Sequence, residues 1–276
     1  RSLPAAHFLP AYLAPYVKHW HGDFFHSIYF HSRLIAQLMA EGFLPMACSS
    51  GRVLLPKLHS ERCVIEDLPR NLHVSKSVRK RASRYVLQVQ QDLNGVIEGC
   101  NIQHAPNCWL YGSLVKCLTS MHQATRDSFA LDNIEISSDV QAKVCSATQQ
   151  ENANGALQNT NSSASNDNFT TIPIRVYSIQ LYRIEEPEKS ENDSHNDEET
   201  TQRNKHLVAG ELGYTVGSIY TSLTGFTNEN GAGSVQLAAL GRLLCQCGFT
   251  MWDLGMDMPY KRDQLGADLM HRHEFV

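Results

Sequence analysis

The second half of the chain has strand patterns on both sides of one long amphipathic helix, and this order limits the possible folds. Residues 172–184 (IPIRVYSIQLYRI) have strand composition, and residues 207–223 predict a hairpin. Residues 234–247 predict a helix with Ser234 as N-cap, and residues 249–256 predict a buried strand. We therefore expect a mixed α+β fold, with a helix packed on a meander of strands.

The first half predicts shorter elements. We expect a small N-terminal α/β domain over residues 1–70 and a larger mixed-sheet domain over residues 71–276. Helices are predicted at 32–41, 75–84, 93–100, 111–122 and 260–265, and strands at 52–56, 62–65, 85–89 and 271–276.

Two polar segments interrupt these patterns. Residues 146–171 hold almost no large apolar side chain, so they cannot offset the entropy of ordering, and we expect a disordered insertion. Residues 185–205 form a second expected insertion, whose first part, 185–199, holds eight acids and one Lys. The whole chain has 28 acids and 24 bases, and without residues 185–199 it has 20 acids and 23 bases. The rest of the chain is therefore mildly cationic.

Composition narrows the classes of protein further. The chain has no run of about 18 apolar residues, so a membrane-spanning helix is not expected. Its eight cysteines include no CxxC pair, and we expect reduced thiols and no metal site. The chain begins at Arg1 rather than Met, so we expect its natural N-terminus to be missing. We expect a cytoplasmic protein, with an organelle as the alternative.

The densest charge cluster lies at residues 70–84 (RNLHVSKSVRKRASR) and contains no acid. Like charges at helical spacing repel, which favours a polyanionic partner such as a phosphate backbone, although a solvated basic helix or a targeting-like patch is the alternative. Its cations are Arg70, Lys76, Arg79, Lys80, Arg81 and Arg84.

Two acids are candidate catalytic groups. Asp253 lies in an apolar strand, where it could take a proton, orient a nucleophile or pair with a nearby base. Glu211 lies between Gly210 and Gly213, which allow close approach to the backbone, so it could face a cationic ligand or point outward.

Aromatic residues could line a pocket or belong to the core, and Trp109 and Phe226 are among them. His271 and His273 lack further ligands at metal-binding spacing. No Walker loop, GxGxxG, HExxH or GxSxG occurs, so the sequence offers no support for nucleotide hydrolysis, hydride transfer or serine hydrolysis.

Several segments, taken in order, resemble the leucyl/phenylalanyl-tRNA–protein transferase family. The most specific are HVSKSVRK at 73–80, VIEGC at 96–100 and LGA at 265–267. The other matches are GFLP at 42–45, Trp109, Met121-His122, LVAG at 207–210, the hairpin to Phe226, Gly248-Phe249 and Asp253. The resemblance covers most of residues 32–276 outside the two insertions.

The resemblance implies a small N-terminal domain packed on an acetyltransferase-like (GNAT) domain. It implies transfer of Leu or Phe from aminoacyl-tRNA to proteins that begin with Arg or Lys, which marks them for degradation, without metal or other cofactor. Asp253 would be catalytic, and the basic cluster would hold the tRNA. Glu211 is an acid that the family pattern lacks, and we expect it to help Asp253 as a new charged group in the same hairpin. The substrate pocket would include Leu38, Met46, Trp109, Leu223 and Phe226.

The chain departs from the family pattern at the reaction centre. The family's Gln two residues after the Asp is Gly255 here, and its Glu in the hairpin is Leu223. The helix Tyr and the Trp of the first domain align with Leu38 and Met46, and a pocket Met aligns with Glu211.

Two alternatives follow from these departures and from the fold. The first is a catalytically inactive relative that binds tRNA or N-terminal degradation signals. The second is an acetyl-CoA-dependent acetyltransferase, although Gly210, Gly213 and Gly217 do not have the spacing of a pyrophosphate loop.

Overall fold

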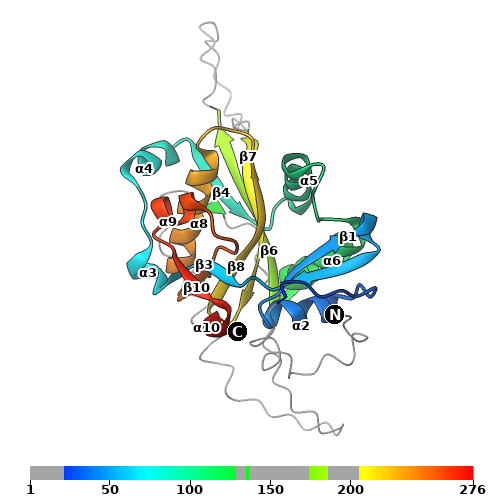
Figure 1. Ribbon diagram of the computed structural model, residues 1–276. Coiled ribbons are helices and arrows are strands. Elements are labelled where there is room, and N and C mark those ends of the chain that lie inside the picture. Colours follow the sequence, from blue (N-terminus) through cyan, green and yellow to red (C-terminus); the bar gives the residue numbers. More distant parts are fainter. Residues whose placement is uncertain (1–21, 129–134, 137–173, 186–204, 276) are drawn as a thin grey trace, which may run out of the picture.

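The computed structural model describes residues 22–128, 135–136, 174–185 and 205–275. Its centre is an eight-stranded sheet with the order β10-β3-β9-β8-β7-β6-β4-β5 (Figure 1). The long strands β6 (Ile174–Ile184), β7 (Lys205–Val216) and β8 (Ile219–Thr227) form an antiparallel meander. The short β9 (Met251–Asp253) runs parallel to β8. The predicted α+β class is confirmed.

The remaining strands extend the sheet and add a second one. In the large sheet they are β3 (Glu61–Glu66), β4 (Tyr85–Val89), β5 (Glu135–Ile136) and β10 (Asp268–His271). The second sheet pairs β1 (Leu44–Cys48) with β2 (Val53–Lys57), joined by the short helix η2 (Ser49–Gly51).

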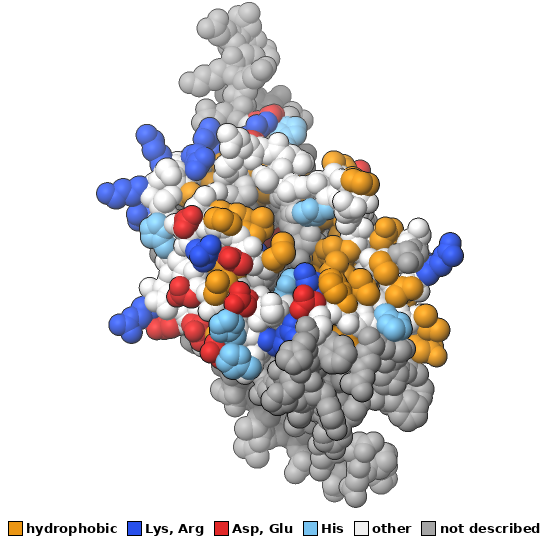
Figure 2. All heavy atoms as spheres, in the orientation of Figure 1, with side chains coloured by type: hydrophobic (Ala, Val, Ile, Leu, Met, Phe, Trp, Pro, Cys, Tyr) orange, Lys and Arg blue, Asp and Glu red, His pale blue; other side chains and the backbone are white. Residues whose placement is uncertain are grey.

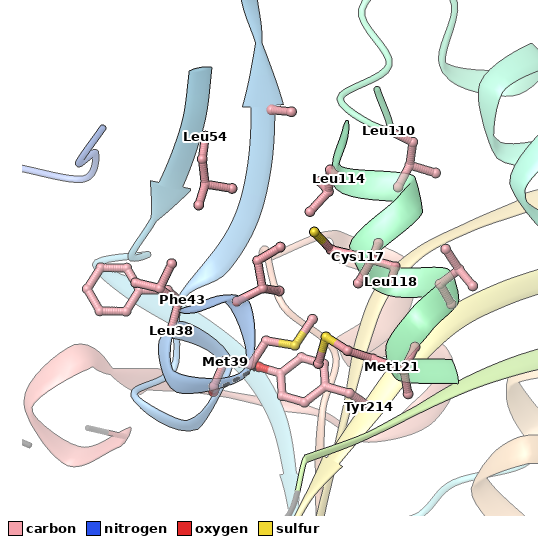
Figure 3. Packing of buried hydrophobic residues seen from close by; sticks show 14 of the residues in the cluster. Leu38, Met39, Phe43, Leu54, Leu110, Leu114, Cys117, Leu118, Met121 and Tyr214 are labelled. Carbon is pink, nitrogen blue, oxygen red and sulfur yellow. Dashed lines mark hydrogen bonds between the residues drawn. The ribbon is translucent and has the colours of Figure 1, made fainter. Parts of the chain in front are cut away.

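Helices cover both faces of the large sheet (Figure 1), and each face has its own apolar core beneath its helices. The α8 face carries α3 (Leu68–Asn71), α4 (Lys76–Ala82), α8 (Ala232–Gln246) and α9 (Pro259–Leu265). The α6 face carries α2 (Ser32–Ala40), α5 (Leu93–His104), α6 (Gly112–Ser128) and the β1–β2 sheet. Figure 3 shows the core of the α6 face, with Leu114 and Leu118 of α6 on one side and Leu38 and Phe43 on the other.

Most predicted elements are present, with corrected ends. Helix α8 begins at Ala232 with Gly231 as N-cap, and Ser234 instead bonds Gln264 through its side chain. The strand predicted at 249–256 has only three residues in β9. The predicted terminal strand at 271–276 is wrong, because β10 ends at His271 and the helix α10 (Arg272–Phe275) follows.

Strand β3 belongs to the large sheet, between β10 and β9, although its residues fall in the predicted first domain. The division at residue 70 stays a prediction. The predicted insertion at 146–171, and nearly all of the one at 185–205, lie outside the described residues. Among the described helices, none combines the length and the apolar character needed to span a membrane.

Candidate functional site

A basic surface lies on and around α4. Ser75 caps this helix by accepting a hydrogen bond from the Val78 amide, and Val78 anchors the helix in the core. Within the described residues, no ion pair involves any of the six predicted tRNA-binding cations. Five of them, Arg70 on α3 and Lys76, Arg79, Lys80 and Arg84 on or after α4, are exposed. Lys and Arg side chains gather at this side of the molecule in Figure 2.

The sixth cation, Arg81, lies against the N-terminus of α8. A Cβ on Gly231 would come within 2.2 Å of Arg81 Nη1, and Gly231 has a φ of +80°. No side chain caps α8, and the buried Nε of Arg81 has no hydrogen-bond partner in the described residues. A guanidinium beside free helix amides raises the local positive potential, which favours a phosphate group near this position.

Asp253 forms a buried ion pair with Arg62 of β3. Both side chains are almost completely buried, and Arg62 also donates to the Gly42 carbonyl. The second oxygen of Asp253 accepts a hydrogen bond from the Gly255 amide at 2.8 Å. Phe275 covers the guanidinium, with its ring centre 4.5 Å away. Asp253 is therefore paired with a basic residue inside the protein, which is one of the roles that the sequence left open for it.

Glu211 is the acceptor of a separate buried network. Its Oε1 accepts hydrogen bonds from Tyr220 and Ser222, and its Oε2 accepts one from Gln236 of α8, all near 3.0 Å. Trp252 donates to the Ser222 hydroxyl. Burial raises the pKa of Glu211, and the three hydrogen bonds oppose this rise. The expectation of an outward-facing acid is wrong.

The two acids lie on opposite faces of the large sheet. Trp252 shares the α8 face with Glu211, because both contact Ser222. Side chains alternate along a strand, so Asp253 points to the α6 face, where Arg62 and Gly42 lie. The structure therefore does not bring the two predicted catalytic acids together.

The basic surface also lies away from Asp253. Asp253 is level with Thr221 at one end of β8, whereas α4 contacts Gly231 beyond Thr227 at the other end. Six residues of strand span about 20 Å. Figure 1 shows α4 and α10 at opposite ends of the sheet. Because α4 covers the α8 face and Asp253 points to the α6 face, a substrate that uses both features must extend along β8 and cross from one face of the sheet to the other.

Lys261 of α9 holds the loop that follows Asp253. It is buried, and its Nζ donates to the carbonyls of Leu254 and Met256 at 2.6 and 2.7 Å. Burial lowers its pKa, although nearby acids, Asp253 and Glu211 among them, oppose this. We did not expect Arg62 or Lys261 from the sequence. Each of these two residues is a single base on an otherwise apolar face of its strand or helix, and this pattern is the feature of the sequence that could have indicated them.

The predicted pocket residues mostly belong to the core of the α6 face. Leu38 and Phe226 are buried there, and Trp109 and Leu223 pack against this core, whereas Met46 is half-buried on β1. Leu223 is the extra residue of a β-bulge.

The glycines near Glu211 serve packing inside the protein. A Cβ on Gly210 would lie 3.0 Å from the Phe226 ring, and one on Gly99 only 2.6 Å from it. A Cβ on Gly213 would clash with the Tyr220 hydroxyl at 2.1 Å. The close approach that the sequence indicated is thus made by the Ile179 carbonyl oxygen, 2.7 Å from a Cβ on Gly210, and by Phe226 and Tyr220.

The edge of β8 beyond β9 faces the end of α5. Strand β9 pairs with β8 only at Ile219–Thr221, so from Ser222 onward β8 lacks a partner on that side among the described strands. His104 Nε2 lies 3.0 Å from the Gly225 carbonyl, and the Thr227 amide donates to Gln103. Backbone groups at such an edge can pair with an extended substrate.

His271 and His273 stack on each other and lie near Glu61 and Glu274. In the part of the chain that the structure describes, no three His, Cys, Asp or Glu side chains are placed to hold a metal ion.

Comparison with known proteins agrees with the resemblance found in the sequence. No curated protein matches the chain. The family model described as leucyl/phenylalanyl-tRNA protein transferase matches residues 194–276, which include β7, β8, α8, β9 and Asp253. Over these C-terminal residues, the chain is similar to the leucyl/phenylalanyl-tRNA protein transferase family.

Proposed function

We propose that the protein moves Leu, Phe or a related amino acid from aminoacyl-tRNA to the N-terminal amine of proteins that begin with Arg or Lys. In this proposal the product is a tagged protein destined for degradation. The observation that carries the proposal is the family match over residues 194–276. The acetyltransferase-like (GNAT) architecture of the larger domain and a cytoplasmic location belong to the same proposal.

The surface charge supports a tRNA partner. The cations of α4 lack carboxylate partners in the described residues, and Arg81 adds its charge to the α8 N-terminus. Phosphates would replace the missing counter-charges and release bound ions. The 3′ end of the tRNA would then follow β8 for about 20 Å toward Asp253.

The reaction joins an amine to an ester. The α-amine attacks the ester carbonyl, a C–N bond forms, and the C–O bond to the tRNA ribose breaks. The amine loses a proton, and the ribose oxygen gains one. Holding both substrates in line supplies much of the rate enhancement in such reactions. Because Asp253 is paired with Arg62 and bound to the Gly255 amide, we assign it the role of ordering the 254–258 loop beside the substrates.

A transfer assay tests this function. Charged tRNAs carrying labelled Leu, Phe, Met or Arg are mixed with peptides that begin with Arg, Lys, Asp or Glu. We expect Leu or Phe to pass to the Arg and Lys peptides, and an Arg79→Ala/Lys80→Ala variant to require more tRNA. Absence of transfer with every pair would refute the enzymatic role.

The second candidate function is an inactive relative that binds tRNA or N-terminal degradation signals. The full hydrogen bonding of both Glu211 and Asp253 favours it, since neither acid is free to take a proton in this arrangement. Tight, salt-sensitive tRNA binding without transfer would support this candidate over the first.

A further inference from the structure

A pocket of about 110 Å³ lies on the α6 face, beside the Arg62–Asp253 pair. Three distant segments form it, namely the end of α2 with Gly42, the β7–β8 hairpin and α10. A single bound water needs about 10–15 Å³ by a comparable measure, so the pocket has room for a short side chain. Figure 3 shows Met39 and Tyr214, which line the pocket, facing each other across their hydrogen bond.

The chemistry of the walls favours a cation on an aliphatic stem. Met39, Val216, Ile219 and Phe275 contribute apolar surface, and Glu41 contributes a carboxylate, with no Lys, Arg or His in the lining. Glu41 is also the C-cap of α2, where the helix carbonyls leave a partial negative charge. Lysine side chains combine an apolar stem with a compact charge of this kind.

Neighbouring groups leave the charge of Glu41 uncompensated. Among the described residues it has no ion pair, and burial raises its pKa. The buried cation Arg62, next to Gly42, donates to the Gly42 carbonyl and Asp253 and lies under Phe275. Tyr214, whose pKa burial raises to about 12, stays neutral. Among the described residues that line the pocket, Glu41 is therefore the charged one, and no cation lines it.

We propose that this pocket binds an alkyl ammonium group, and that Glu41 is its specificity-determining residue. Which molecule carries this ammonium group rests on the proposed function: it belongs to the lysine side chain at the start of the acceptor polypeptide. Thr221 lines the pocket and pairs in register with Asp253, so an acceptor held here lies next to the loop that Asp253 orders.

Direct binding to the full chain, without tRNA, tests the proposal separately from transfer. Calorimetry compares pentylammonium with 1-pentanol, and a peptide that begins with Lys with its norleucine analogue. Putrescine represents a free amine as the alternative source. Glu41→Gln removes the charge, Val216→Phe fills the pocket, and Glu66→Gln changes an exposed acid away from the pocket. Circular dichroism checks that each variant is folded.

We expect pentylammonium to bind and 1-pentanol not to, and the Lys peptide to bind at least tenfold more tightly than pentylammonium or putrescine. Glu41→Gln and Val216→Phe should each weaken peptide binding at least tenfold, and Glu66→Gln should not change it. Binding should weaken as the pH falls through the raised pKa of Glu41, because the neutral acid does not attract the ammonium group.

Equal binding of amine and alcohol, or unchanged binding in folded Glu41→Gln, would overturn the site. Putrescine binding as tightly as the peptide would overturn the assignment of its source. If the Lys peptide binds through Glu41 while no charged tRNA supports transfer, the proposed function fails and the site stands.

Discussion

At the residue scale, Glu211 and Asp253 are both buried acids, but only Asp253 has a cationic partner. Asp253 pairs with Arg62, whereas Glu211 is held by three neutral donors. A carboxylate that is held by neutral groups bears the desolvation cost of its charge. The two acids should therefore respond in opposite ways when their charge is removed.

Glu211→Gln should leave the protein at least as stable at pH 7 and flatten its pH dependence. The folded pKa of Glu211 is raised above 4.5, so wild-type stability falls as the pH rises from about 4.5 through the folded pKa. Glutamine keeps an acceptor for Tyr220 and Ser222, and Gln236 can turn its amide to match the new donor. Urea unfolding between pH 4 and 8 measures this.

Glu211→Leu is the matched control, because it leaves the buried donors Tyr220 and Gln236 and the half-buried Ser222 without their acceptor. We expect a loss of about 2 kcal/mol or more. Transfer activity that disappears in stable Glu211→Gln would show that the carboxylate takes part in the reaction.

Asp253→Asn and Arg62→Met should each destabilise the protein by about 3 kcal/mol, because each leaves an unpaired charge in the core. The double variant Arg62→Met/Asp253→Asn should lose less than the sum of the single losses. Urea unfolding of the four proteins gives this coupling. Additive losses would mean that the buried pair contributes no interaction energy. Transfer activity of Asp253→Asn is measured on the folded variant, so that a loss of activity is not a loss of folding.

At the element scale, local patterns predicted those parts of the fold that depend on local chemistry. The apolar composition of β6 and the N-cap Ser75 of α4 are visible in a short window of sequence. The true start of α8 is not, because Gly231 adopts a left-handed conformation at a place where Arg81 leaves no room for a Cβ. Helix α10 is also hidden, since tertiary contacts of Arg272 hold its four residues.

The candidate site also contains features that a local sequence pattern predicts and features that depend on the tertiary structure. The basic cluster is local, so the sequence predicted it as a unit. The separation of Glu211 from Asp253 depends on how β9 pairs with β8 and on the strand alternation that follows, and no spacing in the sequence reveals that register. The partner of Asp253 lies 191 positions away in β3, beyond any local pattern.

The basic surface gives a prediction for α4 as an element. Arg79→Ala and Lys80→Ala should weaken tRNA binding, and each should reduce the salt slope of log K by about 1. Lys116→Ala, on the exposed side of α6, is the control and should leave the slope unchanged. Filter binding from 50 to 200 mM salt measures the slopes. Equal slopes for all variants would remove α4 from the tRNA surface.

At the scale of the whole molecule, Arg272 connects the two ends of the described chain. Its guanidinium donates to the carbonyls of Gly22, Leu58 and His59 and forms an ion pair with Asp23 at 2.9 Å. This buried cation thus joins α10 to the segment before α2 and to the turn between β2 and β3. The pocket beside Phe275 depends on the same placement of α10.

Arg272→Met should therefore destabilise the whole fold by about 3 kcal/mol, because the charge-assisted hydrogen bonds disappear and leave buried carbonyls without donors. Arg262→Met is the matched control: its ion pair with Asp257 is half-exposed, so it should cost no more than about 1 kcal/mol. Urea unfolding followed by circular dichroism and by tryptophan fluorescence measures both losses. A single shared transition in Arg272→Met would show that both faces of the sheet unfold together. A loss no larger than that of the control would mean that α10 contributes little to the stability of the molecule.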